Sequence, residues 1–138
     1  MTMDNVLADL DGFYVVNYFT DLDLPPGSYE YAKGYFVVKD GQLVGLDLGG
    51  CTLSGTVAVN SEGDVAHLSV LTDPRTGKPG SLVFLDDGST GREPVQRNVI
   101  LKITDVNGKL VLSGTGPIGP GKVSVNAQRV ARLGDANF

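Results

Sequence analysis

The sequence contains one cysteine, one histidine and no tryptophan. Because Cys51 has no second cysteine to pair with, an internal disulfide and a cysteine-rich metal site are both excluded. With His67 as the only imidazole, a metal site would have to use carboxylates alone, and the acidic pairs of this chain lack the ligand ladder of a calcium loop. We therefore predict no metal site, and these residues identify no catalytic group.

Long apolar runs and early basic residues are also missing. No run approaches the length that crosses a membrane, and the first ten residues hold Asp4 and Asp9 without a base, unlike a secretory signal. This pattern predicts a cytoplasmic protein without a membrane segment. Before Lys33 the chain has six acids and no base, against ten acids and eleven bases from there on. Because an acidic segment repels phosphate backbones, we expect no direct nucleic-acid binding; the segment either steers a basic partner or only keeps the protein soluble.

Glycine, by contrast, is abundant, with 19 residues in a chain of 138. It recurs in tight-turn sequences between runs rich in Val, Ile, Leu, Tyr and Thr, namely Asp40-Gly41, Glu62-Gly63-Asp64, Asp86-Asp87-Gly88 and Asn107-Gly108. Such sequences supply the positive φ angles that hairpins need. The turns recur about every 20–25 residues, which leaves room for two short strands each and is typical of a continuous antiparallel meander.

The strand-like runs fall at residues 12–20, 31–39, 43–48, 52–59, 65–71, 82–85, 99–104, 110–112 and 122–130. We therefore predict an all-β protein, a single antiparallel up-and-down barrel of about eight strands, since closure removes exposed edges. One domain covers residues 1–138, with an ordered core at about 12–133 and tails at 1–11 and 134–138. Residues 126–133 also fit helical spacing, so a short terminal helix stays open as an alternative, and we favour the strand.

Two glycine motifs near the end of the chain resemble nucleotide-binding loops. Residues 114–119 match the dinucleotide fingerprint in letters, but Pro120-Gly121 and a strand-like alternation follow where a helix is required. The overlapping run 116–122 places Val123 where a phosphate loop needs Ser or Thr. We interpret both motifs as turns.

Cys51 and His67 could form a nucleophile and base only if the fold brought them together. If Val59 lies opposite Val65 in the hairpin between them, Val57 faces His67 and Cys51 is six residues further along. Six residues of extended strand span roughly 20 Å, far beyond hydrogen-bond reach. We therefore expect Cys51 to be a small packed residue and His67 an ordinary strand residue.

Aromatic residues concentrate early, with eight of the ten in the first 36 residues. An eight-stranded barrel either fills its interior with side chains or holds one small ligand, and whether this interior is filled or hollow stays open. The aromatics could form the core, an interface or the wall of a ligand cavity. The candidate cavity residues are Phe13, Tyr18, Tyr35 and Phe36.

Four segments resemble the GrlR-like family, the negative regulators of type III secretion and their widely distributed relatives. The segments are Gly12-Phe13-Tyr14, the strand–turn–strand run 34–47, Ser54-Gly55-Thr56, and the closing run 112–127. Together the resemblance extends from about Gly12 to Leu133, most of the chain.

The resemblance implies a small calycin-like (lipocalin-like) β-barrel, often a homodimer, with no enzymatic activity and no cofactor. Regulatory members bind and sequester a transcriptional activator through protein contacts, and an acidic hairpin turn after the fourth strand is linked to that role. Here the matching positions are 61–64. We predict a non-enzymatic binding protein that contacts a regulatory protein partner; the alternative is a carrier or sensor of a small apolar ligand in the barrel interior. The candidate partner-binding residues are Glu62, Asp64, Asp21 and Asp23.

Overall fold

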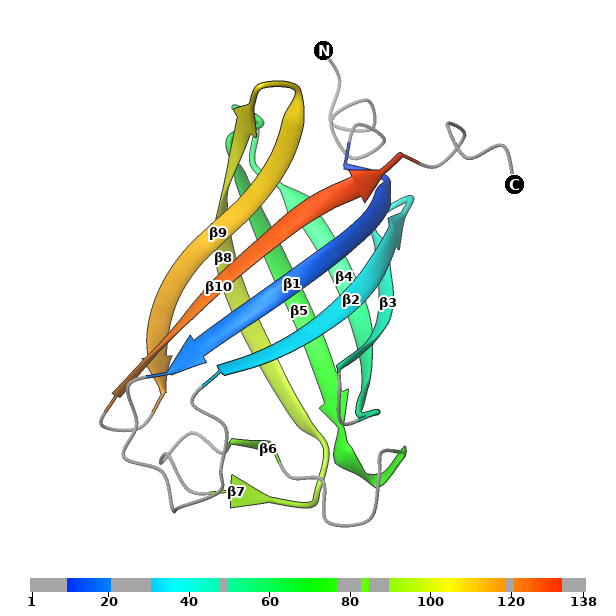
Figure 1. The fold of residues 1–138 in the computed structure, drawn as a ribbon, viewed down its shortest axis with the longest axis vertical. Coiled ribbons are helices and arrows are strands. Elements are labelled where there is room, and N and C mark those ends of the chain that lie inside the picture. Colours follow the sequence, from blue (N-terminus) through cyan, green and yellow to red (C-terminus); the bar gives the residue numbers. More distant parts are fainter. Residues whose placement is uncertain are drawn as a thin grey trace.

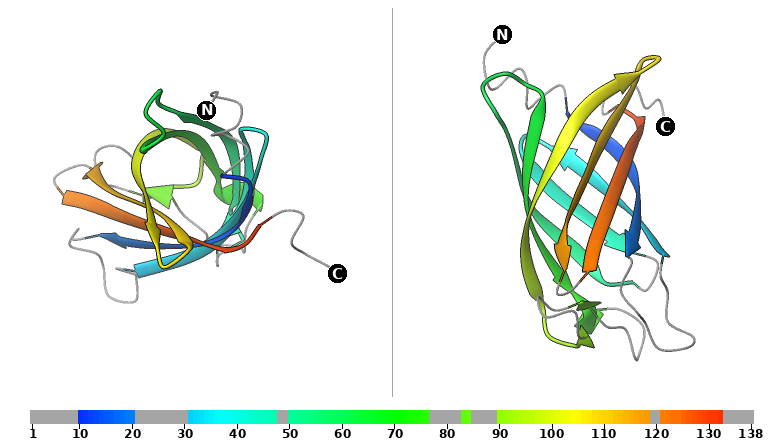
Figure 2. Two further views of the ribbon diagram at one scale, coloured as in Figure 1. Left: turned by 90° about the horizontal axis from the view of Figure 1, so that it is seen from above. Right: turned by 90° about the vertical axis from the view of Figure 1, so that its left-hand side faces the viewer.

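Eight antiparallel strands close into one barrel (Figure 1). The computed structural model describes residues 10–20, 31–47, 50–76, 83–84, 90–118 and 121–132. The barrel strands are β1 (Gly12–Thr20), β2 (Tyr31–Lys39), β3 (Gln42–Asp47), β4 (Thr52–Val59), β5 (Val65–Asp73), β8 (Val95–Val106), β9 (Lys109–Ile118) and β10 (Gly121–Ala131). Each strand pairs with the next along the barrel, and β10 pairs back with β1, which confirms the predicted up-and-down barrel. Figure 2 shows the strands surrounding a common axis.

Tight hairpins gather at one end of the barrel, the upper end in Figure 1, which we call the turn end. The β2–β3 turn has φ angles of 52° at Asp40 and 79° at Gly41, and the β8–β9 turn has 54° at Asn107 and 82° at Gly108. Positive φ at both central residues matches the right-handed twist of the flanking strands. The turns predicted from these two pairs are therefore confirmed, whereas Asp86-Asp87-Gly88 lies outside the described residues.

The β4–β5 hairpin differs from its predicted register. Val59 pairs with Ala66, one residue later than expected, so that His67 lies opposite Ala58. The side chain of Asn60 explains the shift, because its Oδ1 accepts hydrogen bonds from the amides of Asp64 (3.1 Å) and Val65 (3.0 Å). These bonds hold Asn60 beside the start of β5, so the turn between β4 and β5 is longer than the predicted one.

The opposite end, which we call the loop end, carries the longer connections. There the 3-10 turn η1 (Pro74–Thr76) follows β5, and β6 (Val83–Phe84) pairs with β7 (Thr90–Gly91) in a small separate sheet (Figure 1). The strand predicted at 82–85 therefore does not belong to the barrel, and β8 begins at Val95 rather than near residue 99. At the other end of the sequence, the favoured strand at 122–130 is confirmed as β10.

The core fills the turn-end half of the barrel. Because successive strand side chains alternate between faces, every second residue points inward. On β1, Tyr14 and Val16 are each 1% exposed, while the intervening Val15 is 39% exposed. The ring of Tyr14 stacks on Phe36 of the neighbouring strand, with centroids 5.0 Å apart. The inward residues of all eight barrel strands join in one apolar cluster.

Candidate functional site

The predicted acidic turn lies at the turn end, between β4 and β5. Glu62 and Asp64 are both exposed there. The Asp64 carboxylate accepts a 2.7 Å hydrogen bond from Asn60 Nδ2, and its backbone carbonyl accepts one of 2.8 Å from the amide of Ile103 on β8. Asp64 therefore helps to build the turn, whereas Glu62 projects from it. Asp21 and Asp23, the other two candidate partner residues, lie outside the described residues.

The four candidate cavity aromatics do not share one cavity. Phe36 is buried in the core and Tyr18 packs against it from inside the barrel. Tyr35 is 53% exposed, and Phe13 alternates with the buried residues of β1, which places both on the outer wall. Neighbouring side chains of a strand point to opposite faces of the sheet. The prediction grouped residues from both faces, so they cannot all line one cavity.

The outward aromatics belong instead to a continuous apolar surface over β1, β2 and β3. Strand register sets it in two rows, since Val15 pairs with Tyr35 and Tyr35 with Leu46, while Phe13 pairs with Val37 and Val37 with Val44. The most exposed members are Val44 at 64% and Tyr35 at 53%. We name this surface the outer apolar face; its residues are Phe13, Val15, Tyr35, Val37, Val44 and Leu46.

The margin of the outer apolar face at the turn end is acidic. Asp11 precedes β1, and its carboxylate accepts a 3.0 Å hydrogen bond from the amide of Asp40 in the β2–β3 turn. Lys39 is the exposed cation beside them. The exposed pair Glu62 and Asp64 lies at the same end of the barrel, between β4 and β5, while the basic residues Lys109, Arg129 and Arg132 lie at this end on the side of β9 and β10.

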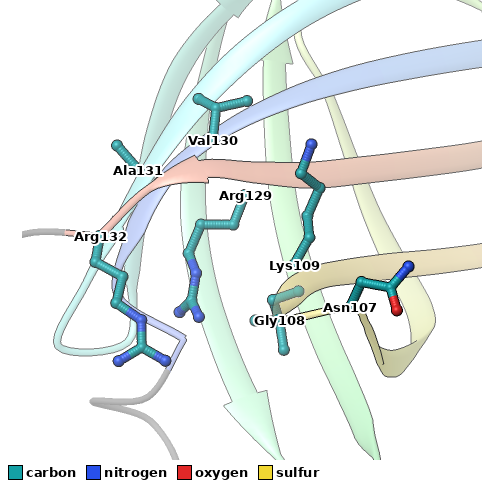
Figure 3. Close-up of a pocket in the computed structure, with 8 residues that line it drawn as sticks. Asn107, Gly108, Lys109, Arg129, Val130, Ala131 and Arg132 are labelled. Carbon is teal, nitrogen blue, oxygen red and sulfur yellow. The ribbon is translucent and has the colours of Figure 1, made fainter.

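A shallow pocket of about 340 Å³ opens at the turn end, between the β8–β9 hairpin and the end of β10 (Figure 3). Figure 3 shows the side chains of Arg129 and Arg132 extending to the same side of β10. Sequence reasoning missed this pocket, although the alternation of Val123, Val125 and Ala127 signals an inward position at 129. The residues that line the pocket are Asn107, Gly108, Lys109, Leu110, Arg129, Val130, Ala131 and Arg132.

Arg129 lines this pocket and is buried, with 8% of its surface exposed. Its guanidinium donates to the backbone carbonyl of Asp11, at 3.5 Å, and to the hydroxyl of Tyr14. Burial raises the pKa of Tyr14 to about 12, an effect that the positive charge of Arg129, and to a smaller degree that of Arg132, offsets in part. Both guanidiniums therefore act on the same hydroxyl at the turn end.

Some inward residues of the barrel are only partly buried. Towards the loop end these include Tyr18, Val70, Val99 and Val125, and beside the β8–β9 turn they are Ile103 and Leu110. A β-carbon added to the inward-facing Gly116 would meet no heavy atom within 4 Å. Burial raises the pKa of Tyr18, and the nearby Asp47 carboxylate raises it further. The loop-end half of the interior could accept an apolar ligand with one polar group.

The structure does not bring the remaining chemical groups together. Cys51 is buried at the loop end, and His67 is exposed on β5 opposite Ala58, seven residues further along β4, a span of about 23 Å. Gly114 and Gly116 of the fingerprint-like motif lie within β9 and pair with β10, while Gly119 is outside the described residues. In the part of the chain that the structure describes, no three His, Cys, Asp or Glu side chains could hold a metal ion together.

The fold and these surfaces define a closed eight-stranded antiparallel barrel with an apolar outer face and a cationic pocket at its turn end. Comparison of the chain with protein-family models, with curated proteins and with solved structures found no match. Within the described residues no helix is long and apolar enough to span a membrane.

Proposed function

We propose that this protein is a non-enzymatic binding protein that acts by contact with a regulatory protein partner, as the resemblance to the GrlR-like regulators implies. The observation that supports the proposal is the outer apolar face. Apolar patches on the surface of a soluble protein mark contact surfaces most clearly when they exceed a few hundred Å², and the outer apolar face would form the centre of such a surface. The core does not require these residues, because they point away from it.

The size of the outer apolar face suits the centre of an interface. By the strand spacing and rise of a β-sheet, its six outward residues cover about 200 Å² of wall. A standard interface buries about 800 Å² on each partner, so polar residues around the face would form the rim. Asn17 and Lys33, paired across β1 and β2, are the next row towards the loop end.

The charge at the margin selects the kind of partner. At the turn end, Asp40, Glu62 and Asp64 lie on the side of β2 to β5, away from the basic residues of β9 and β10, and favour a partner whose contact surface has an apolar centre and basic residues on that side. Each exposed pair would contribute at most about 1 kcal/mol and would mainly raise the association rate. A second copy of this chain would bring the same acidic margin and a net charge of −5, so we favour a different, basic protein as occupant.

The test compares two serine substitutions at equally exposed sites. Val44→Ser removes an apolar side chain from the outer apolar face, and Ile100→Ser removes one from β8, outside the face; the two residues are 64% and 63% exposed. The probe is the purified DNA-binding regulator encoded nearest to this gene, titrated by calorimetry. We expect Val44→Ser combined with Tyr35→Ser to weaken binding at least about tenfold and Ile100→Ser less than about twofold.

Equal losses in the two variants, or no binding by the wild type, would refute the proposal. Light scattering of the same samples tests the homodimer that the resemblance implies. A dimer that Val44→Ser dissociates and Ile100→Ser preserves would assign the face to a second copy of the chain.

The space beside the inward-facing Gly116 supports a second candidate, carriage of a small apolar ligand. Native mass spectrometry of the purified protein should then detect a retained molecule, and Gly116→Leu, which fills the space beside Gly116, should abolish it. Retention of the same mass by the variant would exclude the interior as the binding place.

A further inference from the structure

The turn-end pocket depends on a β-bulge near the end of β10. Along the pair of β1 and β10, Tyr14 lies opposite Arg129 and Phe13 opposite Ala131, so Val130 is an extra residue without a partner. In a regular strand, residues 129 and 132 would point to opposite faces. The extra residue reverses the alternation and turns Arg132 to the side of Arg129, as Figure 3 shows.

This arrangement concentrates positive charge in an acidic protein. The chain has a net charge of −5, yet three of the eight residues that line the pocket, Lys109, Arg129 and Arg132, are basic and none of the eight is acidic. Two carboxylates of the same end accept hydrogen bonds from backbone amides. Asp105 accepts a 2.8 Å hydrogen bond from Gly108, and Asp11 accepts one from Asp40.

The two arginines differ in mobility because they differ in burial. Arg129 is fixed by its contacts with the Asp11 carbonyl and the Tyr14 hydroxyl, while Arg132 is exposed beyond the end of β10. A guanidinium can bind the two oxygens of a carboxylate or phosphate at once. A fixed and an adjustable guanidinium on one side of a strand could therefore hold one anionic group between them.

The rest of the pocket fits a small organic body. Leu110, which packs against the core, provides apolar lining, whereas Figure 3 shows the side chains of Val130 and Ala131 on the side of β10 opposite the two arginines. The volume of about 340 Å³ is near the lower end of the range for small-molecule sites. A bare inorganic ion would leave this apolar wall in contact with water. The lining therefore favours an anion that carries a compact apolar group.

From this geometry we propose that the turn-end pocket binds a small organic anion, whose carboxylate or phosphate group lies between Arg129 and Arg132 and whose apolar part contacts Leu110. The site is separate from the outer apolar face and from the barrel interior. Its occupancy does not depend on the protein partner proposed above.

Isothermal titration calorimetry with three probes tests this site. Benzoate and phenyl phosphate carry the two anionic groups on one apolar ring, and inorganic phosphate lacks the ring. We expect saturable binding of at least one ring-bearing probe, tighter than that of inorganic phosphate. The stronger of benzoate and phenyl phosphate identifies the anionic group.

Matched variants connect that binding to the pocket. Arg132→Gln should weaken it at least about tenfold, since a charge-assisted hydrogen bond is lost, and Arg132→Lys should restore part of the affinity. Lys39→Gln makes the same change in net charge at the same end of the barrel but outside the pocket lining, and should weaken binding less than about twofold. The proposal is overturned if no probe binds more tightly than about 1 mM, or if Lys39→Gln and Arg132→Gln lose affinity equally.

Discussion

The hydroxyl of Tyr14 donates a 2.6 Å hydrogen bond to the backbone carbonyl of Leu10, inside the turn end of the barrel. Both residues are buried, so water cannot replace this bond. Arg129 lies on the neighbouring strand β10, and its guanidinium donates a hydrogen bond to the next backbone carbonyl along the chain, that of Asp11. The two contacts fasten the segment that enters β1 across the end of the barrel, next to the turn-end pocket.

Tyr14→Phe should therefore destabilise the protein although the ring and its packing remain. Removal of the hydroxyl leaves the buried Leu10 carbonyl without this donor, and we expect the free energy of unfolding to fall by about 1–3 kcal/mol. Urea denaturation measures the change. Tyr35→Phe, at 53% exposure on the outer wall, is the control and should stay within about 0.5 kcal/mol of the wild type. A loss no larger than that of the control would show that the bond contributes nothing.

The raised pKa of Tyr14 predicts a loss of stability in alkali. Burial raises this pKa from 10.0 to about 12, so the folded state holds the phenolic proton more tightly than the unfolded chain. Between pH 10 and 12 the unfolded chain loses the proton first, and the free energy of unfolding decreases as the pH rises. The full contribution, present below pH 10, is about 3 kcal/mol. The pKa of the inward-facing Tyr18 is also raised, which adds to the slope.

Urea denaturation from pH 8 to 11 tests this dependence. Tyr14→Phe should start lower and lose stability less steeply above pH 10, because one of the two shifted tyrosines is gone. An equally steep decline in the variant and the wild type would assign the alkaline transition to other groups.

Much of the fold follows from local rules that the sequence displays. Asp40-Gly41 and Asn107-Gly108 adopt the positive φ angles that their residue types favour, and the apolar alternation of β10 reports its inward face. The β4–β5 register was predicted wrongly because Asn60 decides it through side-chain hydrogen bonds, which no periodicity records.

The candidate sites were harder to predict than the strands. Phe13 and Tyr35 were placed with inward aromatics because residue type was weighed above strand parity, and the outer apolar face was therefore missed. The bulge at Val130 has no signal of its own, since neither Gly nor Pro marks it. In a strand without the bulge, Arg132 and Arg129 would point to opposite faces, so the sequence gives no reason to place them in one site.

Two turn glycines offer a comparison of backbone strain with and without a steric contact. Gly108 has a φ of 82° and open space around an added β-carbon, whereas at Gly41, with a φ of 79°, a β-carbon would approach the Val57 carbonyl to 3.3 Å. We expect Gly108→Ala to cost about 1 kcal/mol from the left-handed backbone alone, and Gly41→Ala to cost more. Thermal unfolding of the two variants measures both. Equal losses would mean that the Val57 carbonyl moves aside without cost.

Two strand glycines, Gly55 and Gly116, differ in the space beside them. A β-carbon at Gly55 would lie 1.8 Å from the backbone carbonyl oxygen of Ser69, while at Gly116 it would meet nothing within 4 Å. Gly55→Ala must therefore push β4 and β5 apart, and we expect it to cost more than about 3 kcal/mol or to prevent folding. Gly116→Ala should instead raise the free energy of unfolding by up to about 1 kcal/mol, because it reduces the freedom of the unfolded chain at no steric cost. Urea denaturation measures both variants. A destabilised Gly116→Ala protein would show that the loop-end interior beside β9 is filled, and the case for a ligand there would be lost with it.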